Sequence, residues 1–127
     1  MSLPFFLVED NVLIQKNLIS ALDELAGAKV MEVFPSESEA VAWLQANPDH
    51  WKLGVIDLFL AQGSGLGVVQ QCRGRSADQR VVVLTNYATA DIARKALARG
   101  ADAIFDKSTE LDAFFAYCTA HRLALHL

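Results

Sequence analysis

The sequence lacks the features that would place this chain in a membrane or in an oxidising compartment. No apolar run in its 127 residues approaches the roughly 18 residues that a membrane-spanning helix needs. The first residues lack the positive start and apolar stretch of a secretory signal peptide. The only cysteines, Cys72 and Cys118, are far apart in apolar helical patterns, so we expect reduced, buried thiols and no disulfide or metal site. These absences predict a cytoplasmic protein with no membrane partner.

An excess of basic residues is also absent. Lys and Arg number 11 against 15 Asp and Glu, which gives a net charge of -4 and a pI near 5.2. Such a chain would repel a phosphate backbone, so we expect no direct contact with nucleic acid. His50, His121 and His126 share no metal-ligand spacing with one another or with the cysteines, and we expect them at the surface.

Apolar residues, in contrast, are plentiful at 53% of the chain. A chain of this length can bury roughly two thirds of its unfolded surface, and no linker, repeat or low-complexity segment interrupts it. We therefore expect residues 1–127 to form one domain.

Short apolar runs, each typical of a buried strand, are separated by stretches with helical periodicity. The runs are Phe5 to Val8, Val30 to Phe34, Leu53 to Ile56, Val81 to Leu84 and Ala103 to Phe105. Helices are predicted between them and after the last, at about 12–27, 36–46, 65–74, 89–100 and 110–122. This alternation predicts an α/β fold with a parallel sheet, right-handed crossovers and helices on both faces.

Two of the predicted helices carry more specific signals. Ser36 followed by Glu39 is a capping-box pattern that marks a helix start. The last helix is expected to bury its apolar residues, which are Leu111, Phe114, Phe115 and Cys118. Trp43 and Trp51 are interpreted as packing residues.

Polar side chains follow four of the five predicted strands. Asp57 ends the central strand, and the others are Glu9 and Asp10 after the first strand, Thr85 after the fourth and Lys107 after the fifth. Because parallel strands present their carboxyl ends at one edge of the sheet, we expect these residues to share one pocket. The stretch 63–67 is rich in glycine but lacks the Lys-Ser/Thr of a phosphate-binding loop, so we interpret it as a turn and helix start.

The motifs around these residues resemble the receiver domains of bacterial two-component response regulators. They are Val-Glu-Asp-Asn, Val-Ile-Asp-Leu-Phe-Leu with a glycine downstream, Val-Leu-Thr-Asn and Gly-Ala-Asp-Ala-Ile-Phe-Asp-Lys. Each motif is weak alone, but together they are strong because they occur in order and at receiver spacing. The resemblance implies a five-stranded parallel sheet of order 2-1-3-4-5, with a domain core at about residues 5–122.

The resemblance also implies a role for each polar residue. Asp57 would accept a phosphoryl group from a sensor histidine kinase or phosphotransfer protein, with Lys107 and Thr85 contacting the phosphoryl oxygens. Asp10, Asp57 and the backbone carbonyl of Phe59 would bind Mg²⁺ or Mn²⁺, and Glu9 would act through water. The domain would be a signalling switch, not an enzyme with a separate substrate.

Partners are implied in the same way. Phosphorylation would alter the face formed by the fourth helix, fifth strand and fifth helix, which would contact a downstream protein or an output domain. Many members form a homodimer through this face when phosphorylated.

The sequence departs from the family pattern at four positions. Ala61 stands where proline is usual, Ser108 replaces the proline that forms a cis peptide after the lysine, Ile104 replaces Tyr or Phe, and Asn86 is bulkier than the usual Ala or Gly. We hypothesise that Asn86, with two aromatic neighbours at 59 and 87, crowds the path of attacking water and slows dephosphorylation.

Two other interpretations stay open at this point. One is a pseudo-receiver, an interaction module that no longer takes a phosphoryl group, which Asn86, Ile104 and Ser108 favour. The other is a phosphohydrolase of the haloacid dehalogenase type, which also uses a strand-end aspartate. That chemistry needs a second aspartate two residues after Asp57, where this chain has Phe59.

Overall fold

Strands and helices alternate strictly in the computed structural model, which describes residues 2–126. All strand pairs are parallel, and the strand order is β2-β1-β3-β4-β5. The predicted α/β fold and sheet order are confirmed. The elements are β1 Leu3–Val8, α1 Val12–Ala26, β2 Ala28–Phe34, α2 Glu37–Ala46, β3 Leu53–Ile56, α3 Gly65–Gln71, β4 Arg80–Thr85, α4 Ala90–Arg99, β5 Ala103–Asp106 and α5 Leu111–Ala124.

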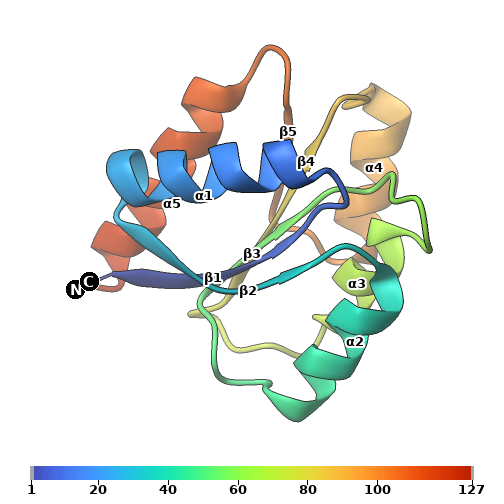
Figure 1. Cartoon of the computed structure of the whole chain (residues 1–127), viewed down its shortest axis with the longest axis horizontal. Coiled ribbons are helices and arrows are strands. Elements are labelled where there is room, and N and C mark those ends of the chain that lie inside the picture. Colours follow the sequence, from blue (N-terminus) through green and yellow to red (C-terminus); the bar gives the residue numbers. More distant parts are fainter. Residues whose placement is uncertain (1, 127) are drawn as a thin grey trace.

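Helices cover both faces of the sheet, with α1 and α5 on one side and α2, α3 and α4 on the other (Figure 1). Successive residues of a strand point to opposite faces, so β1 contributes to both cores. Phe5 and Leu7 pack with Phe114 of α5, whereas Phe6 and Val8 belong to the core beneath α2 and α3. Because its side chains are buried on both faces, the middle of the sheet is rigid and can hold a site at its edge.

The two tryptophans belong to the core, as predicted. The ring of Trp51 lies edge-on to that of Phe6, with 4.9 Å between the centroids, and Trp43 lies 5.9 Å from the same ring. Edge-to-face and tilted pairs of this kind each contribute about 1 kcal/mol beyond the area they bury. Both tryptophans therefore stabilise the face that α2 and α3 cover.

The helix starts follow from their capping residues. Ser36 caps α2 by accepting a hydrogen bond from the Glu39 N–H at 3.4 Å, and its hydroxyl donates to the Glu39 carboxylate at 2.9 Å. Asn11, not Asp10, caps α1, because its side chain accepts from the Ile14 N–H. The carboxylate of Asp10 is therefore free of a capping role.

The structure corrects several predictions. His121 is buried, not at the surface, and its Nε2 donates to the Lys52 carbonyl at 2.9 Å. Leu111 is exposed instead of buried, because it begins α5 where no other element covers it. α5 continues to Ala124, two residues beyond its predicted end, and α3 ends at Gln71, before the predicted glycine. Within residues 2–126, no helix is long and apolar enough to cross a membrane.

Candidate functional site

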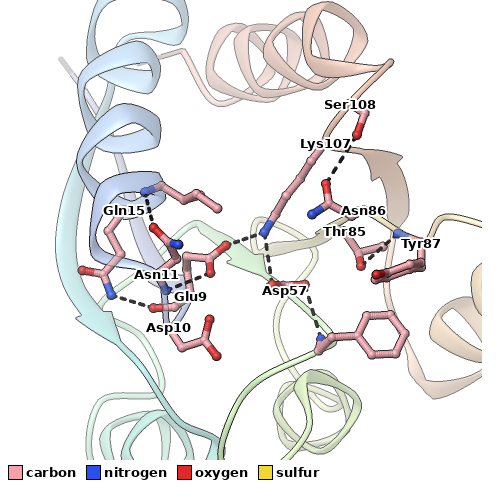
Figure 2. Close-up of polar contacts among 12 residues, drawn as sticks. Glu9, Asp10, Asn11, Gln15, Asp57, Thr85, Asn86, Tyr87, Lys107 and Ser108 are labelled. Atoms are coloured by element: carbon pink, nitrogen blue, oxygen red, sulfur yellow. Dashed lines mark hydrogen bonds and ion pairs between the residues drawn. The ribbon is translucent and has the colours of Figure 1, made fainter.

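The carboxyl ends of the strands bring four polar residues together at one edge of the sheet. Glu9 and Asp10 follow β1, Asp57 follows β3, and Lys107 follows β5. In Figure 2 the Lys107 side chain reaches between Glu9 and Asp57, and Asp10 lies below Glu9. Thr85, the last residue of β4, ends the strand next to β3.

Lys107 is the counter-charge at the centre of this group. Its ammonium donates to Oε1 of Glu9 and, at 3.1 Å, to Oδ2 of Asp57. All three side chains are nearly excluded from water. Burial by itself lowers the pKa of Lys107, but the hydrogen bond to Glu9 and the charge of Asp57 outweigh it, so the pKa lies above its usual value. Lys107 is therefore charged at neutral pH.

Asp10 joins the two carboxylates that Lys107 contacts to form a cluster of three. Glu9, Asp10 and Asp57 each place one oxygen within 4.8 Å of the others. One ammonium cannot neutralise three carboxylates at this distance. Carboxylate oxygens are the ligands that Mg²⁺ and similar hard cations prefer, so this donor set fits a divalent cation.

Hydrogen bonds and close packing hold the backbone between β3 and α3 at the site. The Phe59 N–H donates to Oδ1 of Asp57 at 3.3 Å, which places this part of the loop beside the carboxylate. A Cβ atom on Gly65 would lie 2.0 Å from the Asp57 carbonyl oxygen, so α3 can begin here only with glycine. The sequence requirement at position 65 is thus steric.

Thr85 and the turn that carries Lys107 are joined through the backbone. The Lys107 N–H donates to the Thr85 carbonyl at 2.9 Å, and the Thr85 hydroxyl oxygen accepts from the Tyr87 N–H at 3.4 Å. The Thr85 side chain is fully buried and makes no hydrogen bond to Asp57 or Lys107. After Lys107 the turn is held by the Asp106 carboxylate, which accepts from the Ser108 N–H at 2.7 Å.

Two aromatic rings stand at the rim of the site. Phe59 and Tyr87 are 49% and 62% exposed, and their rings meet edge-on with centroids 5.2 Å apart. Asn86, between Thr85 and Tyr87, accepts a hydrogen bond of 3.5 Å from the Ser108 hydroxyl (Figure 2). The three residues that we expect to crowd the site thus lie on the two loops that border it.

Sequence reasoning missed three groups that support the site. The Gln15 amide donates to the Glu9 carbonyl at 2.6 Å, the Ala61 N–H donates to Oδ2 of Asp10 at 2.6 Å, and Glu37 accepts from the Ser64 N–H at 2.8 Å. The contacts of Ala61 and Glu37 join residues 51 and 27 positions apart in the sequence, and no local pattern marks them. Gln15, one turn into α1 and six residues after Glu9, is the only one of the three that the sequence could have indicated.

This fold and site define a receiver domain of the response regulators. The chain matches the family described as response regulator receiver domain over residues 5–118, and it belongs to that family.

Several known proteins are similar to it. The photosynthetic apparatus regulatory protein RegA of Cereibacter sphaeroides is 36% identical over 104 residues, which are 82% of this chain and 54% of RegA. The acid tolerance regulatory protein ActR of Rhizobium meliloti is 34% identical over 106 residues, 84% of this chain and 53% of ActR. The chain thus spans about half the length of these curated relatives.

A solved structure supports the fold independently. It is a response regulator protein from Burkholderia pseudomallei with a phosphorylated aspartic acid, a calcium ion and citrate. The two are 24% identical with a TM-score of 0.77, and the alignment covers 98% of this chain and 71% of that one.

Proposed function

We propose that this receiver domain accepts a phosphoryl group on Asp57 from a sensor histidine kinase or a phosphotransfer protein. The observation that carries the proposal is the placement of the Asp57 carboxylate, held between the Lys107 ammonium and the Phe59 N–H at the end of a buried strand. A fixed, partly desolvated carboxylate beside a cation is suited to attack an electrophilic phosphorus.

The transfer exchanges one bond at phosphorus for another. An Asp57 oxygen attacks the phosphorus of a phosphohistidine, the new O–P bond forms, and the P–N bond breaks with its electron pair on the imidazole. Lys107 neutralises charge on the phosphoryl oxygens, and the buried Thr85 hydroxyl is the donor for one of them once the group is attached. The chemistry of the domain is then limited to its own phosphorylation and dephosphorylation.

The same proposal includes a divalent cation, Mg²⁺ or Mn²⁺. Asp10, Asp57 and the Phe59 carbonyl would bind it directly, and Glu9 would act through water. The cation would offset the repulsion between the carboxylates and an incoming phosphoryl group. What supports this part is a cluster of three carboxylates of which one ammonium contacts only two.

We further infer that α4, β5 and α5 form the face whose contacts change on phosphorylation. Ala96 is the one buried residue of α4, so few apolar contacts anchor this helix. Thr85 is five residues before the start of α4, and a shift of Thr85 would pull on the connecting loop. The partner of this face is a downstream protein, an output domain or a second phosphorylated copy.

Phosphorylation by a small donor tests the proposal. With Mg²⁺ and acetyl phosphate, the wild-type chain should gain the mass of one phosphoryl group, and Asp57→Asn should gain none. Beryllofluoride with Mg²⁺ should shift amide NMR signals near Asp57, Thr85 and α4 in the wild type alone. A chain that gained no mass and showed no such shifts would be a pseudo-receiver, and the proposal would be rejected.

A further inference from the structure

Besides the Phe59 N–H bond to Asp57 and the packing of Leu58 and Leu60 in the core, hydrogen bonds to two other elements hold the β3–α3 loop, residues 58–64. Near its middle, the Ala61 N–H donates to Oδ2 of Asp10 at 2.6 Å. At its end, the Ser64 N–H donates to Oε1 of Glu37 at 2.8 Å, and the Glu37 N–H donates to the Gln62 carbonyl at 3.3 Å. The loop therefore spans from the carboxylate cluster to the first residue of α2.

Glu37 fits this loop closely. Its Oε2 lies 2.0 Å from where a Cβ atom on Gly67 would be, so the carboxylate rests directly against the backbone of the first turn of α3. Charge-assisted hydrogen bonds from backbone N–H groups to a carboxylate are among the stronger ones. A half-buried carboxylate in this position fixes the end of the loop.

The Ala61 N–H binds the carboxylate of Asp10, which has fewer hydrogen-bond partners than the carboxylates of Glu9 and Asp57. Lys107 contacts the carboxylates of Glu9 and Asp57, which also accept backbone N–H groups from Asn11 and Phe59. The carboxylate of Asp10 has only the Ala61 N–H among residues 2–126. Its orientation in the absence of a cation is therefore set by the loop.

From these contacts we infer that Glu37 is a positioning residue for the cation site, although it belongs to α2 and lies outside the carboxylate cluster. By fixing the loop through Ser64, Glu37 keeps the Ala61 N–H on Asp10 and so raises the affinity of the cluster for a divalent cation. The reason is entropic, because a loop and a ligand that are ordered before binding lose less freedom when the cation binds. This inference rests on the cation part of the proposed function.

The test measures the dissociation constant of Mg²⁺ by calorimetry on the full chain. Glu37→Ala removes the acceptor and should weaken binding about three- to tenfold, whereas Glu37→Gln retains an oxygen that accepts the Ser64 N–H and should bind nearly as the wild type.

Amide hydrogen exchange without any cation gives a second measurement. The amides of Ala61 and Ser64 should be protected in the wild type and should exchange faster in Glu37→Ala, while amides of β1 and β3 keep their protection. Fast exchange of the Ala61 amide in the wild type would overturn the inference even if a variant failed to fold.

The outcomes separate the two proposals. A wild type that binds Mg²⁺, together with an unchanged dissociation constant in folded Glu37→Ala, refutes the role of Glu37 and leaves the proposed function intact. A wild type that binds no Mg²⁺ refutes the cation part of the proposed function, and the role of Glu37 falls with it.

Discussion

The ammonium nitrogen of Lys107 lies 3.1 Å from Oδ2 of Asp57, although 50 positions separate the two residues in the sequence. The same nitrogen donates to Glu9, so one positive charge serves two carboxylates that are nearly buried. The acidic cluster therefore depends on Lys107 for its stability as long as no other cation is bound.

Removing this charge should destabilise the cation-free protein. Lys107→Ala leaves Glu9 and Asp57 without a counter-charge, and we expect the free energy of unfolding to fall by about 3 kcal/mol. Because the folded-state pKa of Lys107 is raised, its contribution is complete below the unfolded-state pKa and is lost only as the pH rises through the folded-state pKa. Urea unfolding at neutral pH with a chelator measures the change.

Mg²⁺ and Lys107→Arg provide the controls for this experiment. The arginine variant keeps the charge and should lose less stability than the alanine variant, and Mg²⁺ should restore part of the loss in Lys107→Ala. An alanine variant as stable as the wild type in chelator would show that the ion pairs contribute nothing net.

The two buried thiols should make stability fall at alkaline pH. Burial raises the pKa of Cys72 and of Cys118 from 9.0 to about 12, although Arg75 partly opposes the shift at Cys72. Between these values the unfolded chain releases both thiol protons and the folded chain keeps them, so rising pH favours unfolding. From about pH 8 to about pH 10 the two thiols should cost about 2 to 3 kcal/mol.

A double variant isolates this effect from the other groups that titrate in the same range. Cys72→Ala with Cys118→Ala will be less stable at neutral pH because it leaves small cavities. Its stability should nevertheless decline less steeply with pH than that of the wild type. Parallel curves of unfolding free energy against pH would contradict the predicted role of the thiols.

Much of the site could be predicted because it depends on strand ends. Asp57, Thr85 and Lys107 each follow an apolar run, and a parallel sheet necessarily gathers such positions at one edge. Asp57 and Thr85 lie at the ends of neighbouring strands, whereas Lys107 follows β5, beyond β4, and reaches Asp57 through its long side chain. Sequence reasoning could therefore place these residues at one edge of the sheet without knowing any contact.

The supporting contacts could not be found in this way. The bond from Ser64 to Glu37 depends on how α2 is placed against the β3–α3 loop, and the donor at Ala61 is a backbone group with no side-chain signature. His121 is different, because it follows Phe114 and Cys118 at helical spacing and lies on the same buried stripe. Its burial was therefore open to prediction from periodicity.

The aromatic pair of Phe59 and Tyr87 at the rim of the site should lengthen the lifetime of the phosphoryl group on Asp57. The two rings meet edge-on near Asp57 and would leave little room for a water molecule in line with the O–P bond. We expect Phe59→Asn and Tyr87→Glu each to shorten the lifetime, by about tenfold if the barrier falls by about 1.4 kcal/mol. Decay of the phosphorylated mass after removal of the donor measures this.

Tyr87→Phe is the matched control, since it keeps the ring and loses only the hydroxyl. Its phosphoryl lifetime should equal that of the wild type. If Phe59→Asn and Tyr87→Glu also decayed at the wild-type rate, the rim would have no part in excluding water.

The turn after β5 should determine how well the Lys107 side chain is oriented toward Asp57. Asp106 accepts from the Ser108 N–H at 2.7 Å, and the Ser108 hydroxyl donates to Asn86 at 3.5 Å, so side chains hold the turn on both sides of Lys107. Asp106→Ala releases the stronger of these bonds and leaves Lys107 with more conformations. We expect phosphorylation by acetyl phosphate at saturating Mg²⁺ to slow by about three- to tenfold, while the affinity for Mg²⁺ changes little.

A slower phosphorylation rate with an unchanged affinity for Mg²⁺ would show that Asp106 orients Lys107. A loss of both would indicate general damage to the site. Asp106→Asn keeps an oxygen that can accept the Ser108 N–H, so it should phosphorylate nearly as fast as the wild type. Ser108→Ala removes only the weaker, exposed bond to Asn86 and should have a smaller effect than Asp106→Ala. Equal rates in Asp106→Ala and the wild type would mean that the backbone bond from Lys107 to Thr85 fixes the lysine without help from Asp106.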